Sequence, residues 1–378
     1  MLKLSIEPHW FLHKGADAHA LPRVFELLRA IEEGRSISAA AERLGVSYRH
    51  AWGLIRSASK EFGAPLLDMS RGRRATLSAL GKRLVAADRR INARVAPLLD
   101  SLASELEAEI ERARSGEEGS VLRVHASHGY AIELLRDFLI RRNVATDLRY
   151  RGSMEALASF AGSNCDLAGF HAPVGELQRE VLEFYVKWLD PASQVLIHLS
   201  TRRQGIMAAP GNPKTIFSLN DLGRPGVRLI NRQFGSGTRI LLDVLLAREG
   251  VDSSKIAGYD TGEFTHSAVA SCVASGLADT AFGVEAGARQ FGLDFIPVIS
   301  ERYFLVCTEE ALRTQPVRRI HDALQSKQFR AEAARLPGID VTQAGAILRL
   351  DEAFPELRAL RERRKRPASG RPLTAKPA

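Results

Sequence analysis

The sequence predicts an α/β protein in two parts: an all-α N-terminal part ending in one long helix, and a larger two-lobed α/β domain. At 378 residues the chain is too long for one ordinary domain. Apolar residues recur at helical spacing up to residue 113, whereas beyond residue 120 short apolar strands alternate with helices, the pattern of a parallel sheet. Residues 114–120 between them are rich in Gly, Ser and Glu, which predicts a linker.

Three helices and a basic hairpin are predicted in residues 1–78. The helices are expected over 21–34, 39–44 and from about 48 to 61, with Ser38 capping the second and Ser47 the third. Two short strands then enclose a basic tip. Because the second and third helices are joined by a tight turn at a glycine, this is the outline of a winged helix-turn-helix.

Positive charge is concentrated in this region. The chain has a formal net charge of +9, and residues 35–94 alone hold 13 Lys and Arg against 4 Asp and Glu. A compact basic segment is typical of a protein that binds the DNA backbone, although charge alone fits a soluble basic protein equally well. We expect Arg49 to read guanine, and Ser47, Tyr48 and Arg56 to hold phosphates. The predicted DNA-binding residues are Ser38, Ser47, Tyr48, Arg49, His50, Trp52, Arg56, Arg71, Arg73 and Arg74.

The stretch GRSISAAAERLGVSYRHAWGLIRSASKEFG resembles the winged helix-turn-helix of LysR-type and molybdate-sensor (ModE-type) regulators. Both families share an AAxxLxxS core and a wing that ends in xLTxxG, and here the wing reads RGRRATLSALG, with Ser78 where Thr is usual. The SYRHAW run is closer to the molybdate-sensor type. The resemblance covers about residues 20–85 and implies a transcription regulator that binds double-stranded DNA. A helical hairpin without a DNA role is the alternative.

Residues 79–113 predict a single long helix that only Pro97 interrupts. Its apolar stripe consists of Leu80, Leu84, Ala87, Ile91, Val95, Leu98, Leu102 and Leu106. An exposed stripe of this length needs a partner, so we expect a dimerisation helix and a homodimer or tetramer. Packing onto its own domain is the alternative.

Residues 121–350 are predicted to form the two-lobed ligand-sensing domain. Residues 121–345 resemble the cytoplasmic periplasmic-binding-protein-like domains fused to such regulators, which are related to periplasmic molybdate-binding proteins. The motifs that match are SHG (127–129), GS (152–153), DLAGFH (166–171), NRQFGSGTR (231–239) and EFTHSAVA (263–270). We expect the second lobe at about 208–296, with the chain crossing back near residues 296–304. Residues 351–378 are basic and Pro-rich, and we expect a disordered tail.

Candidate ligand-binding residues follow predicted strands or begin predicted helices. In a doubly wound sheet these positions face the ligand crevice, and helix N-termini attract anions. Arg232 and Arg239 would add guanidinium donors. The predicted ligand-binding residues are Ser127, His128, Ser153, His171, Arg232, Gly235, Ser236, Gly237, Thr238, Arg239, Glu263, Thr265 and His266. Each Ser or Thr taken alone could be no more than a helix cap.

The resemblance implies molybdate or tungstate as the effector. The three histidines and Glu263 favour a larger ligand instead, such as a molybdenum cofactor or a small organic acid. The histidines lack the spacing of a metal site, and no other cofactor is expected. No GxSxG, Walker A or HExxH motif is present, so we do not expect an enzyme.

We therefore predict a DNA-binding transcription regulator controlled by a small anion. A LysR-type regulator of a small organic acid and a DNA-associated molybdate carrier without regulatory coupling are the alternatives. The opening sequence is not a signal peptide, and no run of about 18 apolar residues occurs, so a cytoplasmic protein without a membrane partner is expected. Three widely spaced cysteines imply no disulfide framework.

Overall fold

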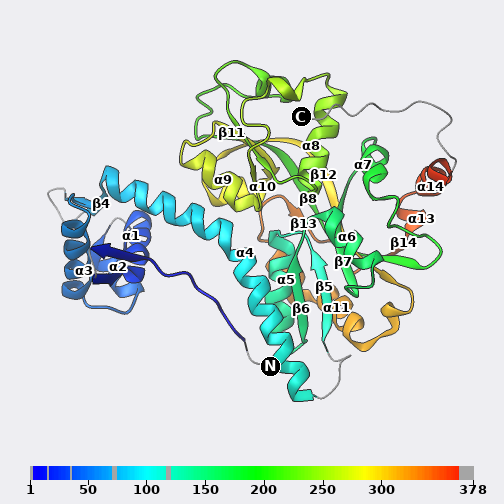
Figure 1. Cartoon of the computed structure of the whole chain (residues 1–378), viewed down its shortest axis with the longest axis horizontal. Coiled ribbons are helices and arrows are strands. Elements are labelled where there is room, and N and C mark those ends of the chain that lie inside the picture. The colour runs from blue at the N-terminus through cyan, green and yellow to red at the C-terminus, as the bar shows by residue number, and fades with distance from the viewer. Residues whose placement is uncertain (1–2, 15–16, 35, 70–74, 116–120, 366–378) are drawn as a thin grey trace.

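The computed structural model describes residues 3–14, 17–34, 36–69, 75–115 and 121–365. It confirms the α/β fold class: small N-terminal helices lead through one long helix to a larger two-lobed α/β domain (Figure 1). Among the described helices, none is both long and apolar enough to cross a membrane.

The N-terminal part contains three short helices and a two-stranded wing. The helices are α1 (Pro22–Gly34), α2 (Ile37–Arg43) and α3 (Tyr48–Glu61), and the wing pairs β3 (Leu67–Met69) with β4 (Ala75–Leu77). A hairpin of β1 (Phe11–Lys14) and β2 (Asp17–Ala20) precedes them, an addition to the expected all-α part. The wing tip, with the predicted DNA contacts Arg71, Arg73 and Arg74, lies outside the described residues.

The cap of α2 differs from the prediction. Ser36, not Ser38, is the N-cap, since the Ser36 hydroxyl accepts from the Ala39 backbone N–H at 3.4 Å. Ile37 is buried in the N-terminal core. Starting the helix at Ile37 places its side chain against that core, and Ser38 becomes an exposed first-turn residue.

One mixed sheet organises the C-terminal domain. Its strands follow the order β10-β9-β11-β8-β12-β7-β5-β6. Their bounds are β5 Leu122–Ala126, β6 Thr146–Tyr150, β7 Leu167–Pro173, β8 Gln194–Ala208, β9 Leu229–Arg232, β10 Gly262–Glu263, β11 Thr280–Val284 and β12 Asp294–Thr308. Two short strands, β13 (Ile339–Asp340) and β14 (Ile347–Arg349), also pair with β8. The long strands β8 and β12 are antiparallel to their neighbours, while β5, β6 and β7 pair in parallel.

The two lobes are joined by β8 and β12, which run through both. Residues 204–208 of β8 pair with β11 in the second lobe, and residues 301–306 of β12 pair with β7 in the first. The return crossing expected near residues 296–304 thus agrees with the middle of β12. The helices of the first lobe are α5 Tyr130–Arg141, α6 Ser153–Ala161, α7 Gln178–Tyr185, α11 Gln315–Gln325 and α12 Lys327–Ala333; those of the second are α8 Gly237–Arg248, α9 His266–Ala274 and α10 Glu285–Gln290.

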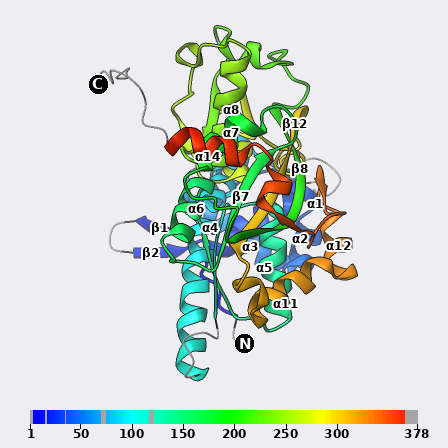
Figure 2. The ribbon, with the colours of Figure 1, turned by 90° about the vertical axis from the view of Figure 1, so that its right-hand side faces the viewer.

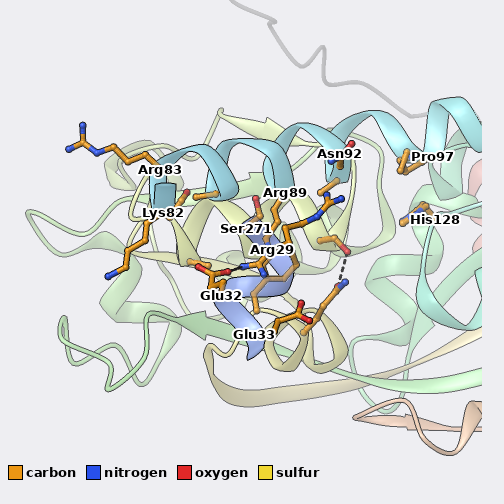
Figure 3. A pocket seen from close by; sticks show the side chains of 18 of the residues that line it. Arg29, Glu32, Glu33, Lys82, Arg83, Arg89, Asn92, Pro97, His128 and Ser271 are labelled. Carbon is orange, nitrogen blue, oxygen red and sulfur yellow. Dashed lines mark hydrogen bonds and ion pairs between the residues drawn. The ribbon is translucent and has the colours of Figure 1, made fainter. Parts of the chain in front are cut away.

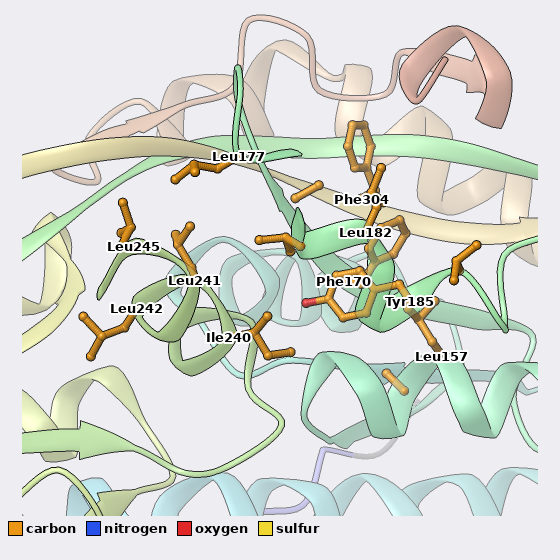
Figure 4. Close-up of a cluster of buried hydrophobic side chains, with 14 of the residues drawn as sticks. Leu157, Phe170, Leu177, Leu182, Tyr185, Ile240, Leu241, Leu242, Leu245 and Phe304 are labelled. Carbon is orange, nitrogen blue, oxygen red and sulfur yellow. The ribbon is translucent and has the colours of Figure 1, made fainter. Parts of the chain in front are cut away.

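The largest apolar core is shared between the lobes. Leucine and isoleucine side chains of α8 pack among aromatic and aliphatic side chains of β7, α6 and α7 (Figure 4). Phe170 and Tyr185 meet edge to face, with ring centroids 5.7 Å apart. Because this core includes a second-lobe helix and first-lobe elements, the structure holds the lobes closed on each other.

The long helix α4 (Ala79–Ser115) packs on the C-terminal domain as well as on the N-terminal helices. It lies along the edge strand β6, where the Ser104 hydroxyl accepts from Leu148 N–H at 2.8 Å and donates to Thr146 O at 3.1 Å. Ser101 accepts from Tyr150 N–H at 3.0 Å. These serines satisfy backbone groups that an open sheet edge would leave unpaired.

The predicted disordered tail is wrong for residues 351–365. They form α13 (Leu350–Ala353) and α14 (Leu357–Lys365), and α14 packs beside α7 (Figure 2). Leu350, Phe354 and Leu357 are fully buried in the shared core. Burial of these apolar residues outweighs the high charge that made the segment look unstructured. Residues 366–378 lie outside the described chain.

Candidate functional site

A buried polar cluster occupies the junction of the two lobes. Ser127 follows β5, Ser153 begins α6, and His171 lies on β7. The Ser127 and Ser153 hydroxyls are 3.1 Å apart, and the Ser153 hydroxyl is 3.5 Å from Nδ1 of His171. The second lobe closes onto them, since a Cβ atom on Gly237 would lie 3.1 Å from the Ser153 hydroxyl. Four of the predicted ligand-binding residues therefore meet here.

Three further residues complete the cluster from the middle of the crossing strands. Arg202 and Gln204 lie on β8 and Glu301 on β12, and all three are buried. Nε of Arg202 donates to the Glu301 carboxylate at 2.5 Å, and the Gln204 amide donates to the same oxygen. Gln204 also donates to the Thr238 hydroxyl at 2.9 Å, at the start of α8. The trio thus links the strands that join the lobes to a predicted ligand-binding residue of the second lobe.

Sequence reasoning missed this trio because Thr201 to Gln204 is a polar run that resembles a surface turn. The sequence signal that could have identified the trio is the alternation of inward-facing and outward-facing side chains along a β-strand, which repeats every two residues. Arg202 and Gln204 share one face of β8, while Arg203 between them is exposed on the other. Inward-facing polar residues in a strand flanked by apolar segments indicate a functional position rather than a surface turn.

Arg232 and His266 add a second basic element. Arg232 ends β9 and is buried, and its guanidinium donates to backbone oxygens of Glu263 and Phe264 at 3.3 and 2.7 Å. Burial, reinforced by repulsion from Arg202, lowers the pKa of Arg232 to about 9. Burial, with the same two arginines nearby, holds the pKa values of His171 and His266 well below 6.5, so both imidazoles are neutral near pH 7.

Several buried nitrogens and oxygens in this region have no hydrogen-bond partner within the described chain. They are His171 Nε2, His266 Nδ1, His128 Nδ1 and the Gln204 side-chain oxygen. Buried polar atoms without partners are rare in folded proteins, because each costs about 1–3 kcal/mol. This is the pattern expected where a ligand supplies the missing partners.

Other predicted ligand-binding residues are used elsewhere. Ser236 caps α8, accepting from Arg239 N–H at 3.2 Å. The Arg239 side chain pairs with Asp243 at 2.8 Å and lies over Tyr259. Gly235, with a φ of +78°, forms the turn before α8, and its carbonyl closely approaches Gly152.

Glu263 and Thr265 face the long helix α4. The Nε–H of Arg94 is shared between the two carboxylate oxygens of Glu263, each 2.9 Å away, and Nη2 of Arg94 also donates to this carboxylate. Thr265 caps α9 and donates from its hydroxyl to the Ala93 carbonyl at 2.9 Å. That carbonyl is available because Pro97, four residues later, has no N–H to bond it. The proline within α4 thus creates an attachment point for the second lobe.

Helix α5 of the first lobe also contacts helices α9 and α10 of the second. The Tyr130 hydroxyl on α5 donates to Gln290 at 2.6 Å and lies 3.0 Å from the Ser267 hydroxyl. His128 pairs with Glu133 at 2.5 Å beside it. A cavity of about 980 Å³ between α1, α4 and the second lobe ends here, with His128 at the end away from Lys82 and Arg83 (Figure 3).

The N-terminal part presents one face of α3 to solvent. Ser47, Tyr48, Arg49, His50 and Arg56 are exposed, and the Ser47 hydroxyl accepts from His50 N–H at 3.1 Å as the N-cap. Trp52 is different, since it is partly buried and packs against the N-terminal core. A shallow hollow of about 440 Å³ lies along this face, lined by Arg49 and His50 among others.

Two family models match the chain. Residues 137–325 match the PBP superfamily domain, and residues 22–82 match the bacterial regulatory helix-turn-helix protein of the lysR family. No catalytic family is indicated by these two matches.

Similar proteins are known in several bacteria. The chain is 31% identical over 219 residues to the uncharacterized protein YvgK of Bacillus subtilis, an alignment that covers 58% of this chain and 70% of that protein. It is 35% identical over 115 residues to the molybdenum-pterin-binding protein MopB of Rhodobacter capsulatus, covering 29% of this chain and 40% of MopB. The Corynebacterium glutamicum OxyR C206 mutant is similar in structure, with a TM-score of 0.41, 15% identity and coverage of 84% and 94% of the two chains.

Proposed function

Because the chain belongs to the PBP superfamily and carries a lysR-family helix-turn-helix, as a LysR-type regulator with a ligand-binding domain does, we propose that a small anion bound between its lobes controls its binding to an operator. The observation that carries this proposal is the contact of α4 with both functional parts. The helix begins at the wing and reaches the second lobe through the Arg94–Glu263 pair.

DNA binding is assigned to the exposed face of α3. Arg49 lies in the first turn of α3, where a recognition helix reaches base edges, and Arg56 lies two turns further along. We assign Arg49 to base reading and Arg56 to the phosphate backbone. The basic residues of the wing tip are proposed as additional phosphate contacts.

Anion binding is assigned to the buried cluster of Ser127, Ser153, His171, Arg232 and His266. Two buried guanidinium groups in the same region favour a negatively charged ligand. Molybdate, tungstate or a molybdenum cofactor is supported by the similarity to MopB, a molybdenum-pterin-binding protein. A small organic acid is the second candidate, favoured by the neutral histidines with free ring nitrogens.

Coupling is assigned to α4. A ligand that favours one arrangement of the lobes shifts the equilibrium only by its difference in affinity for the two states. Since α4 is bonded to β6 in the first lobe and to Glu263 and Thr265 in the second, any change in lobe angle must move or release this helix. The N-terminal end of α4 follows the wing directly and packs against α1, so a movement of α4 would reach the part of the protein that carries the recognition helix.

We also propose a homodimer formed through α4. Leu98, Leu102 and Leu106 are 61%, 44% and 45% exposed and lie on successive turns of one face. A second copy of the helix would bury them. A dimer would bind two half-sites about one helical turn, or a multiple, apart.

DNA selected from a random-sequence pool by the wild-type protein supplies an operator for the test. Arg49→Ala should lose about 1–3 kcal/mol of discrimination at one base pair. Arg56→Ala should weaken all sequences alike and reduce the dependence of binding on salt. If both variants select the wild-type sequence with wild-type affinity, the assignment of α3 is wrong.

Titration of the operator complex with molybdate, tungstate and small carboxylates tests the sensor. An active anion should change operator affinity and protein stability together. An anion that raises thermal stability but leaves operator affinity unchanged would instead favour a carrier without regulatory coupling.

A further inference from the structure

The buried charges at the lobe junction do not cancel. Two guanidinium groups and one carboxylate, those of Arg202, Arg232 and Glu301, are each at most 5% exposed. His171 and His266 beside them are also buried. A buried charge without a partner is costly, so the sum of these charges bears on which ligand the site can hold.

Arg202 is already neutralised within the protein. It is the direct cross-strand neighbour of Glu301, and Nε and Nη2 both lie 2.5 Å from the same carboxylate oxygen. The guanidinium reaches back over the first lobe, where Nη1 is 3.2 Å from the position a Cβ atom would take on Gly129. Glu301 therefore fixes Arg202 at the junction and cancels its charge there.

Arg232 has no such partner. Within the described chain it forms no ion pair with a carboxylate, and its hydrogen bonds go to the backbone oxygens of Glu263 and Phe264 and to the Gln233 amide oxygen. Of the other carboxylates nearby, Glu263 is paired with Arg94, and Glu133 lies 2.5 Å from Nε2 of His128 with 36% of its side chain exposed to solvent. The lowered pKa of Arg232 agrees with a buried cation that repels Arg202 and is only partly offset by Glu301.

We infer that the interlobe site holds a monoanion, a small carboxylate rather than a dianionic tetrahedral oxyanion, and that Glu301 sets this preference by cancelling one of the two buried guanidinium charges. The inference rests on the proposed function of the junction as the effector site. A carboxylate brings the single charge that Arg232 lacks and fits the planar fork of a guanidinium. A second negative charge would face the Glu301 carboxylate in a medium of low dielectric constant.

The neutral imidazoles suit the remainder of such a ligand. Nε2 of His171 and Nδ1 of His266 are buried without partners, and a neutral imidazole nitrogen can accept or donate a hydrogen bond according to its tautomer. A hydroxyl or amide group carried by the carboxylate can both donate and accept, so it would satisfy them in either tautomer. A keto group or a bare oxyanion offers acceptors alone and would satisfy only the tautomers that carry the proton on these nitrogens.

The experiment measures binding of two sets of anions to the full-length protein by calorimetry and thermal shift, at constant ionic strength. One set is acetate, pyruvate and benzoate, and the other is molybdate, tungstate and sulfate. Wild-type protein should bind at least one monocarboxylate and bind each dianion at least about tenfold more weakly, a difference of about 1.4 kcal/mol. Glu301→Gln keeps the shape of the side chain but leaves both guanidinium charges free, so it should raise the affinity for dianions relative to monocarboxylates by about tenfold or more.

Glu285→Gln is the matched control. Glu285 is also buried and pairs with Arg203 and Arg289, and Arg203 faces the side of β8 opposite to Arg202. This variant should leave the ratio of dianion affinity to monocarboxylate affinity unchanged. If Glu301→Gln does not fold, Arg232→Met provides the second measurement, and it should abolish monocarboxylate binding.

Two results would overturn the inference: wild-type protein that binds molybdate or tungstate more tightly than every monocarboxylate, or a Glu301→Gln protein with the wild-type ratio. Operator affinity, measured in the same titrations, separates this inference from the proposed function. If molybdate binds more tightly and changes operator affinity, the proposed regulatory function stands and the monoanion preference is wrong. If a monocarboxylate binds preferentially but does not change operator affinity, the monoanion preference stands and the regulatory function is wrong. Binding of neither set would overturn both.

Discussion

Single residues at the lobe junction are poised to respond to pH. The buried imidazoles of His171 and His266 have pKa values well below 6.5, first because of burial and then because of Arg202 and Arg232. In the unfolded chain both return to about 6.5. Between the folded and unfolded pKa values the unfolded state binds more protons, so folding stability falls as the pH drops below about 6.5.

We therefore expect the free energy of unfolding to decrease between about pH 7 and pH 5, by up to about 1.4 kcal/mol per pH unit for each histidine. His171→Gln and His266→Gln should each flatten this slope in urea denaturation series. His50→Gln, on the exposed face of α3, is the control and should keep it. Burial also lowers the pKa values of His125 and His198, so some slope remains in every variant. Equal slopes in all of these proteins would contradict the assignment.

The individual site residues also show how much of the site the sequence predicts. Ser127, Ser153 and His171 were predicted and lie together, because strand ends and helix starts converge in this type of sheet. Arg239 and Glu263 were predicted too, but nearer partners, Asp243 and Arg94, bind them. Sequence position places a residue near a crevice but does not reveal which partner binds it, whether that partner lies four residues away, as Asp243 does, or 169, as Arg94 does.

At the scale of elements, α4 has two faces with different chemistry. The face toward the C-terminal domain carries small and polar residues, such as Ser101 and Ser104, that bond the edge of β6. The opposite face carries Leu98, Leu102 and Leu106. The sequence predicted the apolar stripe but not the packing of the other face, because serines that bond a strand edge have no periodic apolar signal.

We predict that Leu98→Asp with Leu102→Asp yields monomers. Each leucine that is buried in a dimer contributes about 1.5–3 kcal/mol, and an aspartate there would add an unpaired charge. Sedimentation velocity and native mass spectrometry measure the result. Leu277→Asp, a change at an equally exposed leucine outside α4, should leave the dimer intact. Leu84 is a poorer choice for this test, since it packs partly against the N-terminal core. A dimer that survives the double change would place the interface elsewhere.

At the scale of the whole molecule, the long strands β8 and β12 join the two lobes, and the long helix α4 contacts both lobes. β8 and β12 set the angle between the lobes, and α4 is attached to a lobe on each side of that hinge. The sequence predicted residues 114–120 as the linker between the long helix and the sensing domain, which suggests that lobe closure acts on the helix through this segment. The direct contacts of α4 provide a shorter route, which sequence patterns do not show because Arg94 and Glu263 are 169 residues apart.

Arg94→Ala should therefore uncouple the sensor from the operator. It removes the ion pair that joins α4 to Glu263 of the second lobe, while the Thr265–Ala93 hydrogen bond and the serine contacts with the first lobe stay in place. The factor by which an active anion changes operator affinity, typically 5- to 150-fold or about 1–3 kcal/mol, should fall toward one. Operator binding in the absence of the anion should be retained, since Arg94 contacts the second lobe and is not among the residues assigned to DNA binding. By linkage, the factor by which operator DNA changes anion affinity must fall equally.

Glu105→Gln is the matched control for this prediction, because Glu105 pairs α4 with Arg149 of the first lobe at 2.9 Å. That pair does not span the hinge, and Ser101 and Ser104 hold the same surface, so the coupling factor should stay near its wild-type value. Exchanging the charges, with Arg94→Glu and Glu263→Arg together, should restore part of the coupling that either change alone removes. Full coupling in Arg94→Ala would show that closure reaches the recognition helices by another route, and loss of coupling in Glu105→Gln would show that α4 senses the first lobe rather than the angle between the two.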